Sequence, residues 1–73
     1  MTATGITKFV LPEPSERRTL RSDAGRTLAE VGEAVGVSAS AVSRWERGKR
    51  KPQRSHRMAY VAVLRDLEAV GHD

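Results

Sequence analysis

The chain has 73 residues, with thirteen basic and nine acidic residues, no cysteine and a net charge of +4 at pH 7. A chain of this length forms one domain at most, and without cysteine no disulfide or thiolate metal site can reinforce its small core. His56 and His72 have no ligand partners at metal spacing, so we expect no metal, no cofactor and no enzyme activity. The positive charge favours an anionic partner.

No segment is typical of membrane insertion or export. The longest apolar run, residues 58–64, is far too short to cross a bilayer. The N-terminus has no leading positive region and too short an apolar stretch for a secretory signal. We therefore expect a cytoplasmic protein that does not contact membranes.

Residues 1–14 differ in composition from the rest of the chain. Their threonines, two prolines and short apolar patch favour an extended arm over a helix. Three interpretations stay open: a frayed terminus, an arm whose Phe9, Val10 and Leu11 pack on the domain or on a second subunit, and a minor-groove arm carrying Lys8.

A first helix is predicted over residues 15–24, with Ser15 as its N-cap. Leu20 and Ala24 lie four residues apart and mark its inner side. Gly25 follows as a natural helix end.

A second helix is predicted to begin at Thr27, because Glu30 follows at the third position and completes a capping box. Apolar or small residues then recur at the spacing of one helix face: Leu28, Val31, Gly32 and Val35. Gly36 ends this helix and provides a left-handed turn at low cost.

A third helix is predicted to begin after Ser38 as N-cap, with Val42 and Trp45 directed inward and Gly48 at its end. Pro52 indicates a loop. A fourth helix should begin within residues 53–56 and continue to about residue 69, with Gly71 beyond it.

The fourth helix has two arcs. The inner arc, expected to complete the core, consists of Ala59, Tyr60, Val63, Leu64, Leu67 and Val70. The outer arc carries more apolar surface than a lone solvated helix needs: it has Met58, Val61, Ala62 and Ala69 beside Arg65, Asp66 and Glu68. The outer arc therefore suggests an interface, and scattered surface hydrophobes are the alternative.

Seven basic residues lie between positions 44 and 57, opposed there only by Glu46: Arg44, Arg47, Lys49, Arg50, Lys51, Arg54 and Arg57. A helix, a glycine turn, a second helix and a basic loop follow one another in the order of a DNA-binding helix-turn-helix. Gly32 lets the third helix approach the second closely. An ordinary helical hairpin is the alternative, but the basic loop favours DNA binding.

The segment TLAEVGEAVGVSASAVSRWERGKRKP, residues 27–52, resembles the helix-turn-helix of the phage lambda repressor and Cro class, also called the XRE family. Residues 36–38, 42–49 and Pro52 carry the match, which extends over roughly residues 17–70. The resemblance implies an all-α, compact bundle of four to five helices and sequence-specific binding to double-stranded DNA, usually as a homodimer on a palindrome. Two residues depart from the family pattern. Leu28 stands where the family often has a glutamine that anchors a phosphate. Gly32 stands where alanine is commoner, and this glycine lowers the helix propensity by up to ~1 kcal/mol.

The resemblance also assigns base contacts to the outward side of the third helix. Ala39, Ser40 and Arg44 match base-reading positions, and Ser43 lies nearby. The guanidinium of Arg44 fits guanine O6 and N7, and a phosphate clamp or a solvated charge is the alternative role.

Phosphate contacts are assigned to the residues at the groove edge, because a loop there meets the DNA backbone first. They are Thr27, Ser38, Arg47, Lys49, Arg50, Lys51 and Arg54. The alternative is that these charged side chains are only solvated and contact no phosphate.

Glu46 would weaken DNA binding unless it pointed elsewhere. In the resembling family the matching position pairs with an arginine of the first helix, here Arg21, and this implies a structural ion pair. A surface pair of Glu46 with Arg50 is the alternative.

These expectations divide the chain into an N-terminal arm (1–14), a helix-turn-helix DNA-binding domain (15–70) and a tail (71–73). The expected function is that of a small, nucleoid-associated transcriptional regulator of the repressor, Cro or antitoxin type. A protein-binding adaptor, with its basic loop on an acidic partner, is the alternative. The candidate dimer surfaces are the arm at Phe9, Val10 and Leu11, and the helix face around Met58, Val61 and Arg65.

Overall fold

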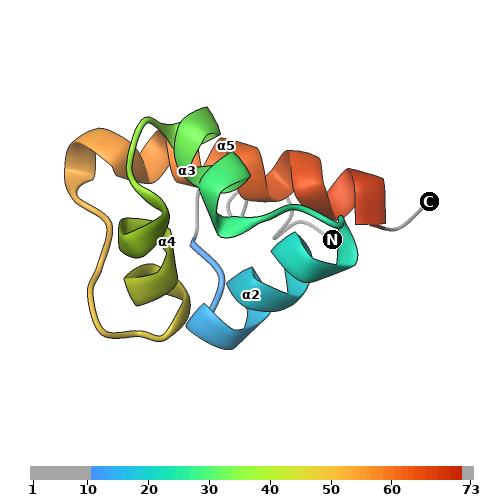
Figure 1. Cartoon of the computed structure of the whole chain (residues 1–73), viewed down its shortest axis with the longest axis horizontal. Coiled ribbons are helices and arrows are strands. Elements are labelled where there is room, and N and C mark those ends of the chain that lie inside the picture. Colours follow the sequence, from blue (N-terminus) through green and yellow to red (C-terminus); the bar gives the residue numbers. More distant parts are fainter. Residues whose placement is uncertain (1–10, 72–73) are drawn as a thin grey trace, which may run out of the picture.

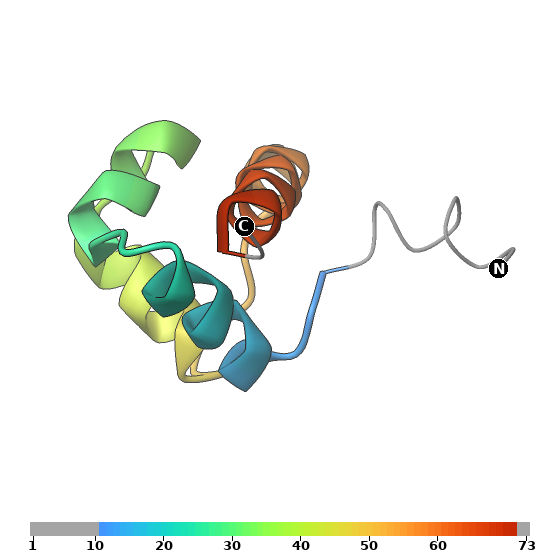
Figure 2. The ribbon, with the colours of Figure 1, turned by 90° about the vertical axis from the view of Figure 1, so that its right-hand side faces the viewer.

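The computed structural model describes residues 11–71, which fold into four α-helices without a strand. The helices are α2 (Pro14–Asp23), α3 (Leu28–Val35), α4 (Ala39–Glu46) and α5 (Arg54–Gly71). Figure 1 shows the long α5 running across the molecule. The turned view shows α5 nearly end-on, with the three shorter helices beside it (Figure 2). The all-α prediction is confirmed, whereas arm residues 1–10 and tail residues 72 and 73 lie outside the described residues.

The start of α2 corrects one prediction, because Glu13 is the N-cap residue and Ser15 lies inside the helix. Pro14 occupies the first helical position, where its fixed φ suits a helix and its missing N–H leaves no donor unsatisfied. At the other end, Gly25 has a φ of +71°. Its N–H donates to the Ser22 carbonyl, so α2 ends at a glycine as predicted.

The caps of α3 and α4 match the sequence prediction. The backbone N–H of Glu30 donates to Thr27 Oγ1 at 3.0 Å, and the Thr27 N–H donates to Glu30 Oε1 at 2.9 Å. Ser38 Oγ accepts from the Ala41 N–H at 3.2 Å. Each helix therefore begins directly after a residue whose side chain accepts from a backbone donor of the first turn.

Two glycines shape the turn between α3 and α4. Gly36 has a φ of +98°, a conformation that residues with a side chain rarely adopt. A Cβ atom at Gly32 would lie 2.6 Å from the Val37 carbonyl oxygen, too close for any side chain without a shift of the turn. The close approach predicted at Gly32 is therefore present, and it places the start of α4 directly against α3.

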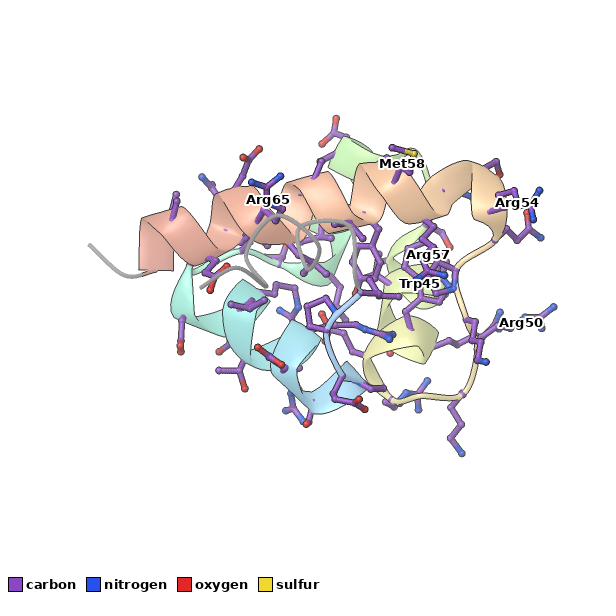
Figure 3. All side chains as sticks on the ribbon, turned by 180° about the vertical axis from the view of Figure 1, so that it is seen from behind. Trp45, Arg50, Arg54, Arg57, Met58 and Arg65 are labelled. Carbon is purple, nitrogen blue, oxygen red and sulfur yellow. The ribbon has the colours of Figure 1, made fainter. Side chains whose placement is uncertain are left out.

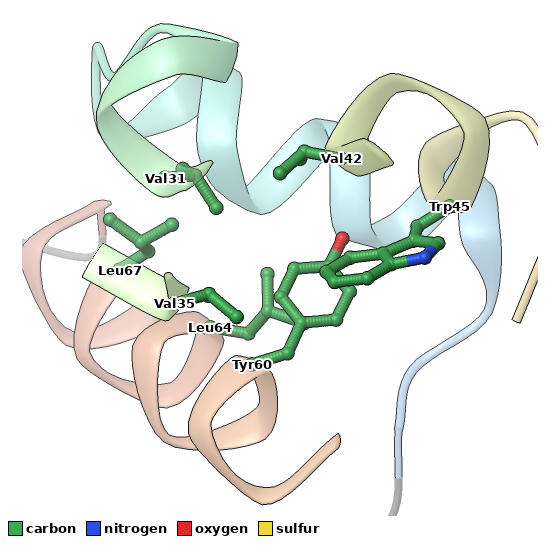
Figure 4. Close-up of a cluster of buried hydrophobic side chains, with 7 residues drawn as sticks. All are labelled: Val31, Val35, Val42, Trp45, Tyr60, Leu64 and Leu67. Atoms are coloured by element: carbon green, nitrogen blue, oxygen red, sulfur yellow. The ribbon is translucent and has the colours of Figure 1, made fainter. Parts of the chain in front are cut away.

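The core lies where α3, α4 and α5 meet (Figure 4). It consists of Val31, Val35, Val42, Trp45, Tyr60, Leu64 and Leu67, as the predicted helix faces require. Leu11 packs against this cluster from the segment before α2, which agrees with the interpretation that the arm residue Leu11 packs on the domain.

Helix α5 differs from its prediction in two respects. It continues to Gly71, so this residue belongs to the helix and not to a tail. Val61 is buried, at 3% exposed, whereas Ala59 is exposed and Val70 is 51% exposed. The buried face of α5 is therefore turned relative to the predicted inner arc, because α5 packs against α2 as well as α3. Val63 faces α3, and Val61 lies on the other side of Leu64.

Tyr60 is more deeply buried than Trp45, the other aromatic residue of the core. It is 0% exposed, and its ring centroid lies 4.7 Å from that of Trp45. Its hydroxyl is buried and has no hydrogen-bond partner among the described residues. Burial, with a smaller contribution from the charge of Glu46, raises the pKa of Tyr60 to about 12.

Because the folded protein holds the Tyr60 proton more tightly than the unfolded chain does, its stability should fall at high pH. The contribution is fully present below pH 10.0, the ordinary pKa of tyrosine, and is lost as the pH rises through about 12. This difference corresponds to roughly 2–3 kcal/mol. Tyr60 is the only tyrosine of the chain, so near-ultraviolet absorbance of tyrosinate measures its titration directly.

The Tyr60→Phe variant is the matched control for this prediction. It should unfold without the alkaline dependence and, below pH 10.0, gain ~1 kcal/mol because the unpartnered hydroxyl is gone. A tyrosine midpoint near the ordinary pKa in the folded protein would contradict the prediction.

Candidate nucleic-acid interface

Helix α4 has a buried side and an open side. Val42 and Trp45 are 0% and 5% exposed and fix the buried side in the core. The four residues to which base contacts are assigned lie away from this side: Ser40 and Arg44 are exposed, and Ala39 and Ser43 are half-buried. The open side is therefore accessible to a nucleic-acid groove.

The end of α4 sets the start of the basic loop. Gly48 has a φ of +70°, and its N–H donates to the Trp45 carbonyl at 3.3 Å. The Lys49 N–H donates to the Arg44 carbonyl at 3.0 Å. These two bonds form a Schellman motif, so the loop leaves the helix in a defined direction.

Five cations lie at the end of α4 or follow it in the sequence. All the basic residues to which phosphate contacts are assigned are exposed: Arg47, Lys49, Arg50, Lys51 and Arg54. None of them forms an ion pair within residues 11–71. Arg50 and Arg54 project at the same end of the molecule (Figure 3). Arg47, the C-cap residue of α4, has its Nε 3.4 Å from the Ser43 carbonyl of that helix. The positive charge of the loop is thus uncompensated there.

Thr27 and Ser38 are exposed at the N-termini of α3 and α4. Each hydroxyl oxygen accepts one backbone N–H as a cap. A hydroxyl that accepts in a cap keeps its own proton for a further acceptor. Capping and donation to a phosphate are therefore chemically compatible.

Arg21 and Glu46 form a bidentate ion pair between α2 and α4, as predicted. Arg21 Nε lies 2.6 Å from Glu46 Oε2, and Nη2 lies 3.0 Å from Oε1. The Glu46 side chain is 5% exposed, and its hydrogen bonds raise the pKa of Arg21. Both carboxylate oxygens are occupied by Arg21, and the alternative pair with Arg50 is not formed in this part of the chain.

Arg17 is a structural residue that the sequence analysis missed. It is 8% exposed, its Nε lies 2.6 Å from the Pro12 carbonyl, and its Nη1 lies 2.9 Å from the Trp45 carbonyl. Burial lowers the pKa of Arg17. The available signal was its spacing: Arg17 lies three and seven residues before Leu20 and Ala24, and therefore on the inner side of α2.

A family model described as a helix-turn-helix domain matches residues 18–71, which include α3, the turn and α4. The chain belongs to the helix-turn-helix domain family. This membership supports a DNA-binding protein. No curated protein and no solved structure matches the chain at a significant level. None of the described helices is long and apolar enough to cross a membrane.

The ion pair predicts a selective loss of stability. Glu46→Gln should destabilise the fold by about 2 kcal/mol, because the partly buried guanidinium of Arg21 loses its counter-charge. Glu33→Gln removes the same charge from an exposed position of α3 and should change stability by less than ~0.5 kcal/mol. Urea denaturation compares the two variants, and equal losses would show that the pair is energetically unimportant.

Proposed function

We propose that the protein is a sequence-specific, double-stranded-DNA-binding transcriptional regulator of the small repressor, Cro or antitoxin type. Helix α4 (39–46) lies in the major groove in this proposal, and the loop that follows it contacts the DNA backbone. The observation that carries the proposal is the open side of α4, bordered by a loop of exposed cations without ion-pair partners among the described residues. Membership of the helix-turn-helix family supports it.

Within this proposal, Arg44 discriminates between bases. Its guanidinium is exposed on the open side of α4, and its planar fork matches guanine O6 and N7 in the major groove. Ala39 contributes contact with a thymine methyl group, while Ser40 and Ser43 bond to several kinds of base edge. One residue thus carries most of the sequence information.

The remaining contacts are assigned to phosphates. Thr27 and Ser38 present hydroxyl groups at two helix N-termini, where anions are favoured. The cations Arg47, Lys49, Arg50, Lys51 and Arg54 supply affinity that depends on salt and not on sequence.

Arg44→Ala should weaken binding to the preferred site by ~1–3 kcal/mol and leave binding to random DNA nearly unchanged. Lys49→Ala is the matched control: it should weaken both about equally and flatten the salt dependence, because it loses a phosphate contact. The preferred site comes from selection of bound duplexes from a random pool, followed by titrations at several salt concentrations. If Arg44→Ala lowers both affinities alike, the guanine-reading role is wrong; if no duplex is enriched, the proposed function is wrong.

We also propose that two copies bind one operator. A single recognition helix with one strong base reader covers too few base pairs to find a site in a genome. The predicted surface around Met58, Val61 and Arg65 needs revision because Val61 is buried, while Met58 is 66% exposed and Arg65 is exposed. In the alternative arm surface, Leu11 packs on the core, and Phe9 and Val10 lie outside the described residues.

The selected sequence should therefore contain an inverted repeat with half-sites ~34 Å apart, one helical turn of DNA. Sedimentation of the complex should give two chains per duplex. Met58→Glu places a charge on the exposed apolar position and should reduce cooperative binding to the full site without weakening binding to one half-site. One chain on an asymmetric site would exclude the dimer and leave the fold assignment intact.

A further inference from the structure

A cavity of about 240 Å³ lies between α4 and the loop that leads to α5. Val37 and Ala41 give it apolar atoms, and Trp45 forms part of its wall. Its cationic lining consists of Arg44, Arg50 and Lys51, and Gln53 and His56 add polar atoms near the start of α5. The cavity thus combines three cationic side chains from two segments of the chain, and no carboxylate lines it.

Three like charges around a small cavity repel one another unless an anion lies between them. Neither Arg44, Arg50 nor Lys51 has an ion-pair partner in residues 11–71. Arginine and lysine together offer several N–H donors, which match the oxygens of a phosphate group. The start of the eighteen-residue α5 adds the positive end of a helix dipole on the same side.

We propose that this cavity is a phosphate-binding site. Its volume of about 240 Å³ is below the range of ~300–1,000 Å³ that is usual for sites of larger organic ligands. The size and the charge therefore favour a compact anion, such as phosphate or pyrophosphate. The phosphate group comes either from a free small molecule or from the backbone of bound DNA.

The cavity shares Arg44 with the open side of α4. A free phosphate or pyrophosphate that engages the Arg44 guanidinium holds it beside Arg50 and Lys51, away from a base edge. This second step rests on the proposed function. Occupancy of the cavity by a free anion is then a means of lowering base discrimination without unfolding the domain.

The first experiment uses the full chain without DNA. Trp45 is the only tryptophan and lines the cavity, so its fluorescence reports occupancy during titration with inorganic pyrophosphate at constant ionic strength. We expect saturation with a dissociation constant below ~1 mM, and about tenfold weaker binding for Arg50→Ala and for Lys51→Ala. Because these residues are exposed, their variants should melt like the unaltered protein.

Lys49→Ala is the control, because it removes the same charge from the same loop outside the cavity lining. Its pyrophosphate affinity should stay within about twofold of that of the unaltered protein. Titration with chloride, and the side-chain nuclear magnetic resonances of His56, separate binding in the cavity from general screening. A fluorescence change that does not saturate, or an equal loss in Lys49→Ala and Lys51→Ala, would overturn the proposal.

A second experiment identifies the source of the phosphate. Single neutral methylphosphonate linkages are placed in turn along the selected duplex. If a backbone phosphate fills the cavity, saturating pyrophosphate at constant ionic strength weakens binding to every duplex except the one with the neutral linkage at that phosphate. If a free anion fills it, pyrophosphate binds the DNA complex as tightly as the free protein, and no single neutral linkage changes this. The pyrophosphate titration tests the phosphate site even if the protein binds no duplex. Failure of the phosphate site and failure of the proposed DNA-binding function can therefore be told apart.

Discussion

The position of α4 depends on two arginines of α2 that hold its C-terminal turn. Arg17 donates to the Trp45 carbonyl, and Arg21 binds both oxygens of the adjacent Glu46 carboxylate. The carbonyls of a final helical turn lack partners within the helix and carry partial negative charge, so cations are favoured there. An eight-residue helix buries only two large apolar side chains here, Val42 and Trp45. The arginine contacts therefore fix the end of this helix against α2, and with it the position from which the basic loop begins.

The same contacts separate the acidic group from the exposed basic surface. Glu46 lies within the most basic stretch of the chain, yet its side chain is 5% exposed and neutralised by Arg21. A solvent-facing carboxylate at this position would reduce the positive potential beside Arg47 and Lys49. Replacing Glu46 by an uncharged residue would destabilise the fold, because Arg21 would then be partly buried without a counter-charge. The pair thus links the orientation of α4 to the electrostatics of its surroundings.

Much of this arrangement could be predicted from the sequence because local chemistry determines it. The Thr27–Glu30 capping box and the Gly36 turn depend on residues a few positions apart. Arg17 was missed because a hydrophobic pattern counts arginine as a surface residue, whereas its aliphatic stem and two carbonyl partners permit burial. Val61 was placed on the wrong arc because periodicity gives the width of an apolar face but not how many helices pack against it. The exposure of the assigned contact residues followed from helix geometry, while the base or phosphate bound by each depends on the DNA itself.

Arg44 serves two tasks with different atoms. Its backbone carbonyl accepts from the Lys49 N–H and so fixes the start of the loop, while its side chain is exposed beside the cavity formed with Arg50 and Lys51. Any residue in this position keeps the carbonyl, so the loop geometry does not depend on the guanidinium. Sequence preference, proposed for the Arg44 side chain, and general affinity, proposed for the loop cations, can therefore change independently by single substitutions. A small domain with a thin margin of stability benefits from this separation, because its recognition surface can vary without altering the contacts that hold α4 in place.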